Sequence, residues 1–206
     1  MAGVTKVLTS IPKKSSRPSF QTMKNYYPKT LNNVGYFSRV LDGHFGVDTY
    51  VSRSELLNSR FPNAGWENTC ALRISVMLNK APEHRINFLF KNDYHVIKNG
   101  MVDYNQKSYE GNDGNIYIPG TNCMGAYLSW VYGRPDYHAL KHKRTSSDKT
   151  IPPELKEIDG GKGIILHLRM GYGGGHIDLW DGTQCYGNQT TYFGTALEIY
   201  YWKLAE

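Results

Sequence analysis

The order of hydrophobic patterns along the chain limits its fold more than any other feature. In the first half apolar residues recur at helical spacing, and Cys70, Ile74, Met77 and Leu78 fall on one face of such a helix. The second half contains short apolar runs separated by glycine-rich or Asp-Gly turns, which is typical of paired strands. Helices followed by antiparallel strands predict an α+β fold rather than alternating βαβ units.

The same patterns give approximate bounds for the elements. Ser16 is a candidate cap for a first helix, with Pro18 in its first turn. The stretch 84–90 is strand-like, and the polar stretch 134–160 is predicted to be a long loop. Helices are predicted at residues 16–27, 51–61, 70–81 and 122–133, and strands at 161–170, 176–182 and in the final stretch 190–204.

The length of 206 residues and a hydrophobic fraction of 40% suit one core. We expect a flexible arm at residues 1–16 and a single domain at 17–206. The net charge of +6 fits an anionic partner such as a cell-wall polymer, or serves solubility alone. The sequence contains no nucleic-acid-binding motif, no general secretion signal and no apolar run near the ~20 residues of a membrane span. Neither nucleic acid nor membrane is therefore an expected partner.

Three cysteines, Cys70, Cys123 and Cys185, form no CxxC pair. This spacing does not favour a metal site built from cysteine, and we expect no metal or cofactor. The odd count leaves open a disulfide between two of the three.

Cys70 lies at the predicted start of a helix, directly after Asn68 and Thr69. Unpaired amides and the positive end of the helix dipole stabilise a thiolate there, and the same amides could hold an oxyanion. A small buried core residue is the alternative for a lone cysteine. That alternative weakens with His176, which opens a strand behind three glycines that would leave space beside the ring. A cysteine at a helix start and a histidine on a later antiparallel strand follow the order of papain-type sites.

A third group should hold the His176 ring in its useful tautomer. Asp178 is two residues along the same strand and therefore shares a face with His176. Asp181 precedes a glycine and also suits a turn, whereas Asn188 lies beyond that turn and could fold back. All three remain candidates.

Several segments together resemble family 4 of the type VI secretion amidase effectors, which are NlpC/P60-like, papain-related peptidoglycan amidases. The resemblance rests on "RPSF" from Arg17, "ENTCALRISVMLN" around Cys70, "YLSWVYGRPD", "GKGIILHL" and "GHIDLWDGTQC" around His176. It implies N-terminal helices packed on an antiparallel sheet, Cys70 as nucleophile and His176 as general base. The implied reaction cleaves the γ-D-glutamyl–meso-diaminopimelate bond of stem peptides.

The chain departs from this family at two positions. The family's aspartate falls eleven residues after the histidine, where this chain has Gly187. Cys185 matches the first cysteine of a short family disulfide, but the second position is Gln189. The resemblance also implies a cognate immunity protein, the type VI secretion machinery as a partner, synthesis in the producer's cytoplasm and action in a target's periplasm.

Two other hypotheses stay open at this point. One is a hydrolase of the same architecture with another acyl substrate, such as a protease, a deamidase or a transglutaminase-like toxin. The other is a non-catalytic wall-binding module, which is motivated by the missing aspartate at Gly187.

Overall fold

The computed structural model describes slightly more than half of the chain. The described residues are 16–28, 70–87, 97–98, 101–102, 108–110, 114–118, 120–140, 151, 156, 158, 160–168, 170, 175–187 and 191–206. The predicted arm, apart from Ser16, and the predicted helix at 51–61 lie outside these residues.

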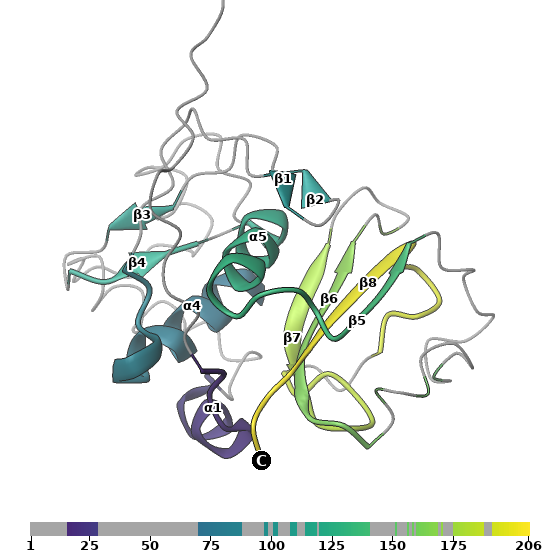
Figure 1. Ribbon diagram of the computed structural model, residues 1–206, viewed down its shortest axis with the longest axis horizontal. Helices are drawn as coiled ribbons and strands as arrows, with labels where there is room; N and C mark the ends of the chain where they lie inside the picture. The colour runs from purple at the N-terminus through teal and green to yellow at the C-terminus, as the bar shows by residue number, and fades with distance from the viewer. Residues whose placement is uncertain are drawn as a thin grey trace, which may run out of the picture.

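A four-stranded antiparallel sheet forms the second half of the fold (Figure 1). Its strands are β5 (Tyr137–Leu140), β6 (Gly163–Leu168), β7 (His176–Trp180) and β8 (Glu198–Lys203), in the order β5-β8-β6-β7. The strands predicted around residues 164, 178 and 200 are thus confirmed, and β7 lies at one edge of the sheet. This position leaves its outer side accessible to side chains from other elements.

Strand β5 corrects the prediction of a continuous loop at 134–160. Its four residues pair with β8, from Tyr137 opposite Tyr201 to Leu140 opposite Glu198. The strand is short and its flanking sequence is polar, so it depends on hydrogen bonds from a partner that is remote in sequence.

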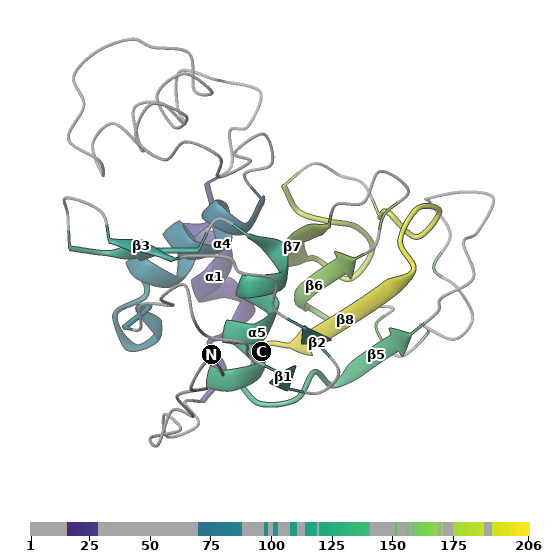
Figure 2. The same cartoon turned by 90° about the horizontal axis from the view of Figure 1, so that it is seen from above.

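In the described part of the chain, three α-helices accompany the sheet: α1 (Phe20–Tyr26), α4 (Cys70–Lys80) and α5 (Thr121–Val131). Figures 1 and 2 show α4 and α5 on the same side of the sheet, next to β6 and β7. The predicted helices at 70–81 and 122–133 are confirmed, and Gly133 ends α5 with a φ of 82°, which favours glycine. The mixed layout confirms the α+β class.

The remaining described elements are short. A 3₁₀ turn at η1 (Pro82–His84) overlaps the start of the stretch predicted as a strand at 84–90, and residues 85–87 are irregular, so the strand prediction is wrong there. Pro82 explains the turn, because it suits the first position of a helical turn. Two small hairpins pair β1 (Ile97–Lys98) with β2 (Met101–Val102), and β3 (Tyr109–Glu110) with β4 (Ile116–Tyr117).

Helix α1 begins later than predicted. Its cap is Ser19, whose hydroxyl accepts a hydrogen bond from the Thr22 amide, and not Ser16. The preceding residues are extended because the chain ends meet here: Ala205 donates to the Pro18 carbonyl, and Phe20 donates to the Ala205 carbonyl. These bonds join the start of the described chain to its C-terminus.

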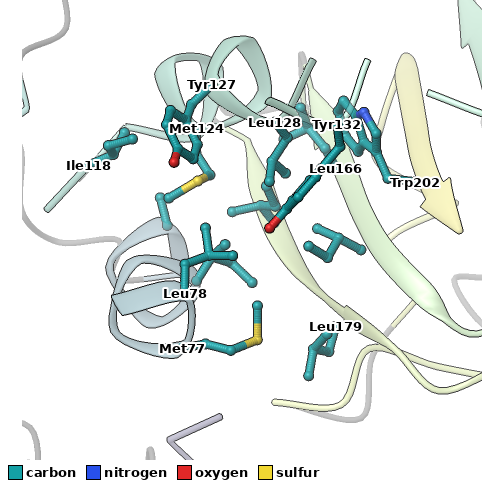
Figure 3. Close-up of a cluster of buried hydrophobic side chains, with 14 of the residues drawn as sticks. Met77, Leu78, Ile118, Met124, Tyr127, Leu128, Tyr132, Leu166, Leu179 and Trp202 are labelled. Carbon is teal, nitrogen blue, oxygen red and sulfur yellow. The ribbon is translucent and has the colours of Figure 1, made fainter. Parts of the chain in front are cut away.

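The main core fills the space between the helices and one face of the sheet (Figure 3). Met77 and Leu78 of α4 and Leu128 of α5 pack there with Leu166 of β6 and Leu179 of β7. A second hydrophobic cluster is formed by strand residues that alternate with those of the main core, together with residues from the segments after β7. It includes Ile165, Trp180, Cys185, Phe193 and Ile199. The two clusters follow the alternation of strand side chains.

Within the described residues, the helices are all too short or too polar to cross a membrane.

Candidate active site

Cys70 is the first residue of α4, and its side chain is 1% exposed. The helix forms because its apolar residues share the face that packs into the main core. Amides in the first turn of a helix lack partners within the helix, and the dipole is positive there. The thiol therefore lies where a developing negative charge is stabilised. Asn68 and Thr69 lie outside the described residues.

His176 is the first residue of β7 and pairs with His167 of β6. Its Nε2 lies 3.2 Å from Oδ2 of Asp178, and its ring also hydrogen-bonds with Cys70. Because Asp178 occupies Nε2, Nδ1 is the ring nitrogen left for the thiol. The structure thus brings Cys70, His176 and Asp178 together.

The pKa of His176 is raised to about 9. Burial alone would lower this pKa, because it disfavours the charged ring. Hydrogen bonds and charge interactions with Asp178 and Cys70 raise it by more. The ring consequently holds a proton at neutral pH, as a donor to a leaving amine must.

Asp178 is completely buried, and its carboxylate is surrounded by donors. Oδ1 accepts from the Tyr27 hydroxyl and from the Leu179 amide at 2.8 Å. The Gly187 amide lies 3.3 Å from Oδ1 and 3.2 Å from Oδ2. These donors replace the water that a buried carboxylate loses, so they fix the charged group in place beside His176.

Tyr27 and Arg73 continue this network away from His176. Tyr27 is the C-cap residue of α1, and Arg73 lies one turn beyond Cys70 in α4. Nη1 of Arg73 donates to the Tyr27 hydroxyl at 3.3 Å. Burial and the charge of Asp178 raise the pKa of Tyr27 well above its usual range, so its hydroxyl stays protonated and can donate to Asp178.

Gly187 lies against the same network. A Cβ at this position would come closer than 3.0 Å to Arg73, Tyr27 and Asp178. The space beside the Gly187 backbone is therefore filled by these three side chains.

The structure describes two of the three candidates for orienting His176. Of these two, Asp178 contacts the ring. Oδ1 of Asp181 instead accepts from the Thr183 amide, the Thr183 hydroxyl and the Gln184 amide, which stabilises the turn after β7. Asn188 lies outside the described residues.

The glycine before His176 has a packing role that the sequence did not indicate. A Cβ at Gly175 would come within 2.6 Å of the Thr121 hydroxyl and 2.8 Å of Leu168. Gly175 thus lets the start of α5 approach the strand, and this space is not open to a ligand. Residues 171–174 lie outside the described part of the chain.

Tyr192 covers the imidazole. Its ring centroid lies 4.3 Å from that of His176, with 34° between the planes. Tyr192 also has a φ of 56°, which costs a residue other than glycine about 1 kcal/mol. The contact limits how the His176 ring can turn.

The nitrogen of His176, an oxygen of Asp178 and the sulfur of Cys185 lie within 4.8 Å of one another, as metal ligands do. Both oxygens of Asp178 already accept hydrogen bonds, however, and burial with the nearby negative charges raises the pKa of the Cys185 thiol. A metal ligand would need that thiol deprotonated. The donor set therefore fits a packed hydrogen-bonding cluster better than a metal site.

Cys70, Cys123 and Cys185 all carry buried thiols. A disulfide between two of these cysteines, which the sequence left open, is not formed, and this includes the pair Cys123 and Cys185.

Comparison with known families identifies the chain. The family described as type VI secretion system (T6SS), amidase effector protein 4, matches residues 66–202. The chain belongs to this family, Tae4. It is therefore an enzyme, an amidase effector that type VI secretion delivers to target cells to attack peptidoglycan.

Solved structures confirm the fold of this Tae4 member. Tae4 of Salmonella Typhimurium, solved as an effector–immunity complex with Tai4, is 22% identical, with a TM-score of 0.58, over 92% of this chain and 100% of that one. Tae4 of Enterobacter cloacae is 19% identical, with a TM-score of 0.57, over 93% and 100% of the two chains. No curated protein sequence matches the chain.

Sequence reasoning missed Tyr27, Arg73 and Tyr192 as neighbours of the site. Tyr27 and Arg73 reach Asp178 only through packing between α1, α4 and β7, which no local pattern encodes. Arg73 did carry a signal, because an arginine among the buried residues of an amphipathic helix needs a polar partner.

Proposed function

We propose that this Tae4 member hydrolyses the γ-D-glutamyl–meso-diaminopimelate bond of peptidoglycan stem peptides through a Cys70 acyl-enzyme. The supporting observation is the contact of Cys70 at the start of α4 with His176, whose Nε2 is held by Asp178. Cys70 and His176 are the catalytic residues, and Asp178 is the positioning residue. The bond itself is inferred from the family resemblance.

The first half of the reaction forms the acyl-enzyme. The reaction begins with His176 protonated on both ring nitrogens, and the Cys70 sulfur, whose proton has passed to Nδ1, attacks the γ-carbonyl carbon of D-glutamate. The carbonyl oxygen becomes an oxyanion near the amides of the first turn of α4. As the C–N bond breaks, the imidazolium protonates the leaving amine of diaminopimelate, and a thioester remains on Cys70.

The second half releases the acyl group. His176, now neutral, takes a proton from a water molecule, and the hydroxide attacks the thioester carbon. The C–S bond breaks, the new carboxyl group loses its proton to water, and the stem leaves with a free γ-carboxylate. Cys70 is then again a thiolate beside the protonated His176. Asp178 keeps the ring in one tautomer through both halves, because its oxygen accepts the proton on Nε2.

The contact of Asp178 with His176 also bears on the non-catalytic alternative. That alternative was motivated by Gly187, where the family resemblance would place an aspartate. A buried carboxylate on the ring from another position supplies the same chemical function, which supports an active enzyme.

We further propose that residues 17–206 form one catalytic domain. The support is that its two ends are joined: Arg17 pairs with Asp136 and donates to the Lys203 carbonyl at 2.9 Å. Synthesis in the producer's cytoplasm, action in the target's periplasm and inhibition by a cognate immunity protein complete the proposal. Its support is family membership, together with the solved complexes of Tae4 and Tai4.

The test is digestion of purified Gram-negative peptidoglycan, with products identified by mass spectrometry. Wild-type protein should release stems that end at D-glutamate, and Cys70→Ala should release none. Cys123→Ala removes a buried thiol from α5 and should keep the activity, which makes it the matched control. Unchanged muropeptides from folded wild-type protein would contradict the proposed bond, and parallel digestion of bacterial proteins would then test the other acyl substrates.

A further inference from the structure

We infer that Tyr27 and Arg73 are positioning residues that act through Asp178 to hold the His176 ring in its working orientation. This inference rests on the proposed function, since it assigns roles within the same site.

The first step concerns Tyr27. Its side chain is 3% exposed, and its hydroxyl donates to Oδ1 of Asp178, while Oδ2 contacts His176. A hydroxyl can donate one hydrogen bond, and Tyr27 donates it to the carboxylate of Asp178. The T-shaped contact of its ring with Tyr186, at 5.6 Å between centroids, fixes the direction of that bond. Tyr27 thus holds the oxygen of Asp178 that does not bind His176.

The second step concerns Arg73. The Tyr27 hydroxyl, having donated its proton, accepts from Nη1 of Arg73. A donor that also accepts from a cation is polarised, so it donates more strongly. Arg73 is 8% exposed, so water screens this interaction little.

The third step is that the contacts close a ring. Cys70 and Arg73 lie one turn apart in α4. Cys70 contacts His176, and His176 contacts Asp178. Asp178 in turn accepts from Tyr27, and Tyr27 accepts from Arg73, which lies on the same helix as Cys70. A ring of five side chains that starts and ends on one helical turn ties the position of the imidazole to the helix that carries the nucleophile.

Gly187 is the fourth part of this arrangement. Its amide donates to Asp178, and any side chain there would overlap Tyr27, Arg73 and Asp178. Gly187→Ala should therefore lower kcat several-fold by displacing the network. Gly160→Ala is the control: its φ of 71° strains a side chain, but a Cβ there contacts nothing within 4 Å, so stability falls while kcat holds.

The decisive experiment is a double-mutant cycle on peptidoglycan hydrolysis. Tyr27→Phe keeps the packed ring and loses only the hydroxyl, and we expect kcat to fall about tenfold with KM unchanged, as for one hydrogen bond to a charged group. Asp178→Asn should lower kcat about 100-fold. If Tyr27 acts through Asp178, the double variant falls no further than Asp178→Asn, whereas independent effects would multiply to about 1000-fold.

Tyr132→Phe is the matched control. The Tyr132 hydroxyl is also buried, and it has no hydrogen-bond partner within the described residues. Its removal should leave kcat unchanged.

Arg73→Lys keeps the charge but not the planar fork, and kcat should fall less than in Tyr27→Phe.

The alkaline limb of the pH profile gives a reading that a merely structural role would not move. Losing the Tyr27 hydroxyl loosens the bond of Asp178 to His176. In Tyr27→Phe, activity should therefore fall at a lower pH than in the wild type and at a higher pH than in Asp178→Asn. Among the described residues, the ionisable groups around Asp178 and His176 are Cys70 and Arg73 of α4, Tyr27 at the end of α1, His167 of β6, and Cys185 and Tyr192 from the later segments.

The outcomes separate this inference from the proposed function. If Cys70→Ala hydrolyses as the wild type does, the proposed function fails. If Cys70→Ala is inactive but Tyr27→Phe keeps full kcat and the wild-type pH limb, or if the two effects multiply, the role of Tyr27 and Arg73 is overturned and the Cys–His mechanism stands.

Discussion

On one side of β7, Ile177 and Leu179 pack into the core shared with α4 and α5, whereas on the other side His176 and Asp178 are held by hydrogen bonds. Both sides are buried, and they come from alternate residues of one five-residue strand. On the apolar side any side chain of similar shape could contribute the same energy. On the other side Trp180 also packs among apolar residues, but both carboxylate oxygens of Asp178 and Nε2 of His176 have hydrogen-bond partners, so shape alone cannot replace these two residues.

This difference separates stability from chemistry along a single strand. Apolar packing is spread over many contacts, and losing one side chain weakens the fold without changing the geometry of a distant bond. The polar side concentrates its effect in a few bonds to one carboxylate. Substitutions on the two sides should therefore affect different measurements.

The largest effect on activity is expected from Asp178→Asn. The amide keeps the shape of the carboxylate, but its NH₂ group cannot accept the proton of His176 Nε2 or of the Tyr27 hydroxyl. We expect kcat to fall about 100-fold, while much of the far-UV circular dichroism signal is retained. Near-wild-type turnover by folded protein would show that another group, such as Asn188, orients the ring.

On the apolar side, Leu179→Ala should lower the free energy of unfolding by about 2–5 kcal/mol. The side chain is completely buried in the main core, so its loss leaves a cavity. Denaturant unfolding gives this value, and kcat per folded molecule should stay near that of the wild type. A large loss of kcat at full folding would mean that the two sides of β7 are coupled.

The sequence predicted the apolar side of this comparison better than the polar side. Periodicity gave α4, α5, β6 and β7, because each buries one face against the rest. The approach of His176 to Asp178 also follows from alternation along one strand. β5 and the true start of α1 were missed, because both depend on partners elsewhere in the chain, namely β8 and the C-terminal residues around Ala205.

The network behind Asp178 could not be predicted for a related reason. Tyr27 and Arg73 come from two helices that are separated by a long stretch of chain, and only tertiary packing brings them to the carboxylate. The family resemblance directed attention to Gly187 as a missing aspartate. The structure shows that Gly187 borders the carboxylate of Asp178. An acidic side chain is therefore present beside His176, although it comes from a different position in the sequence.

The pH dependence of the free energy of unfolding should report the protonation of His176. The pKa of His176 in the folded protein is about 9, above its ordinary value of 6.5, so the folded state binds this proton more tightly. The contribution is fully present below pH 6.5 and is lost as pH rises through 9. Its full size is on the order of 3 kcal/mol.

Urea unfolding at pH values across this window measures the loss, and His176→Gln should flatten it. His84 cannot imitate the effect, because burial lowers its pKa and moves its contribution to the acid side of 6.5. A wild-type curve as flat as that of His176→Gln would contradict the paired imidazolium.

The smallest effect is expected where an aspartate lies near the site in sequence but outside its network. Asp181 accepts three hydrogen bonds within the turn after β7, at 2.9 Å each, and none of them involves His176. Asp181→Ala should cost about 1 kcal/mol of stability, as the loss of a capping side chain does, and leave kcat unchanged. Asp181→Asn should restore most of that stability, since an amide oxygen can still accept. Because Asp178 and Asp181 are three residues apart in sequence, a fall in kcat for Asp181→Ala comparable with that of Asp178→Asn would show that the turn, and not only the face of β7, sets the position of the ring.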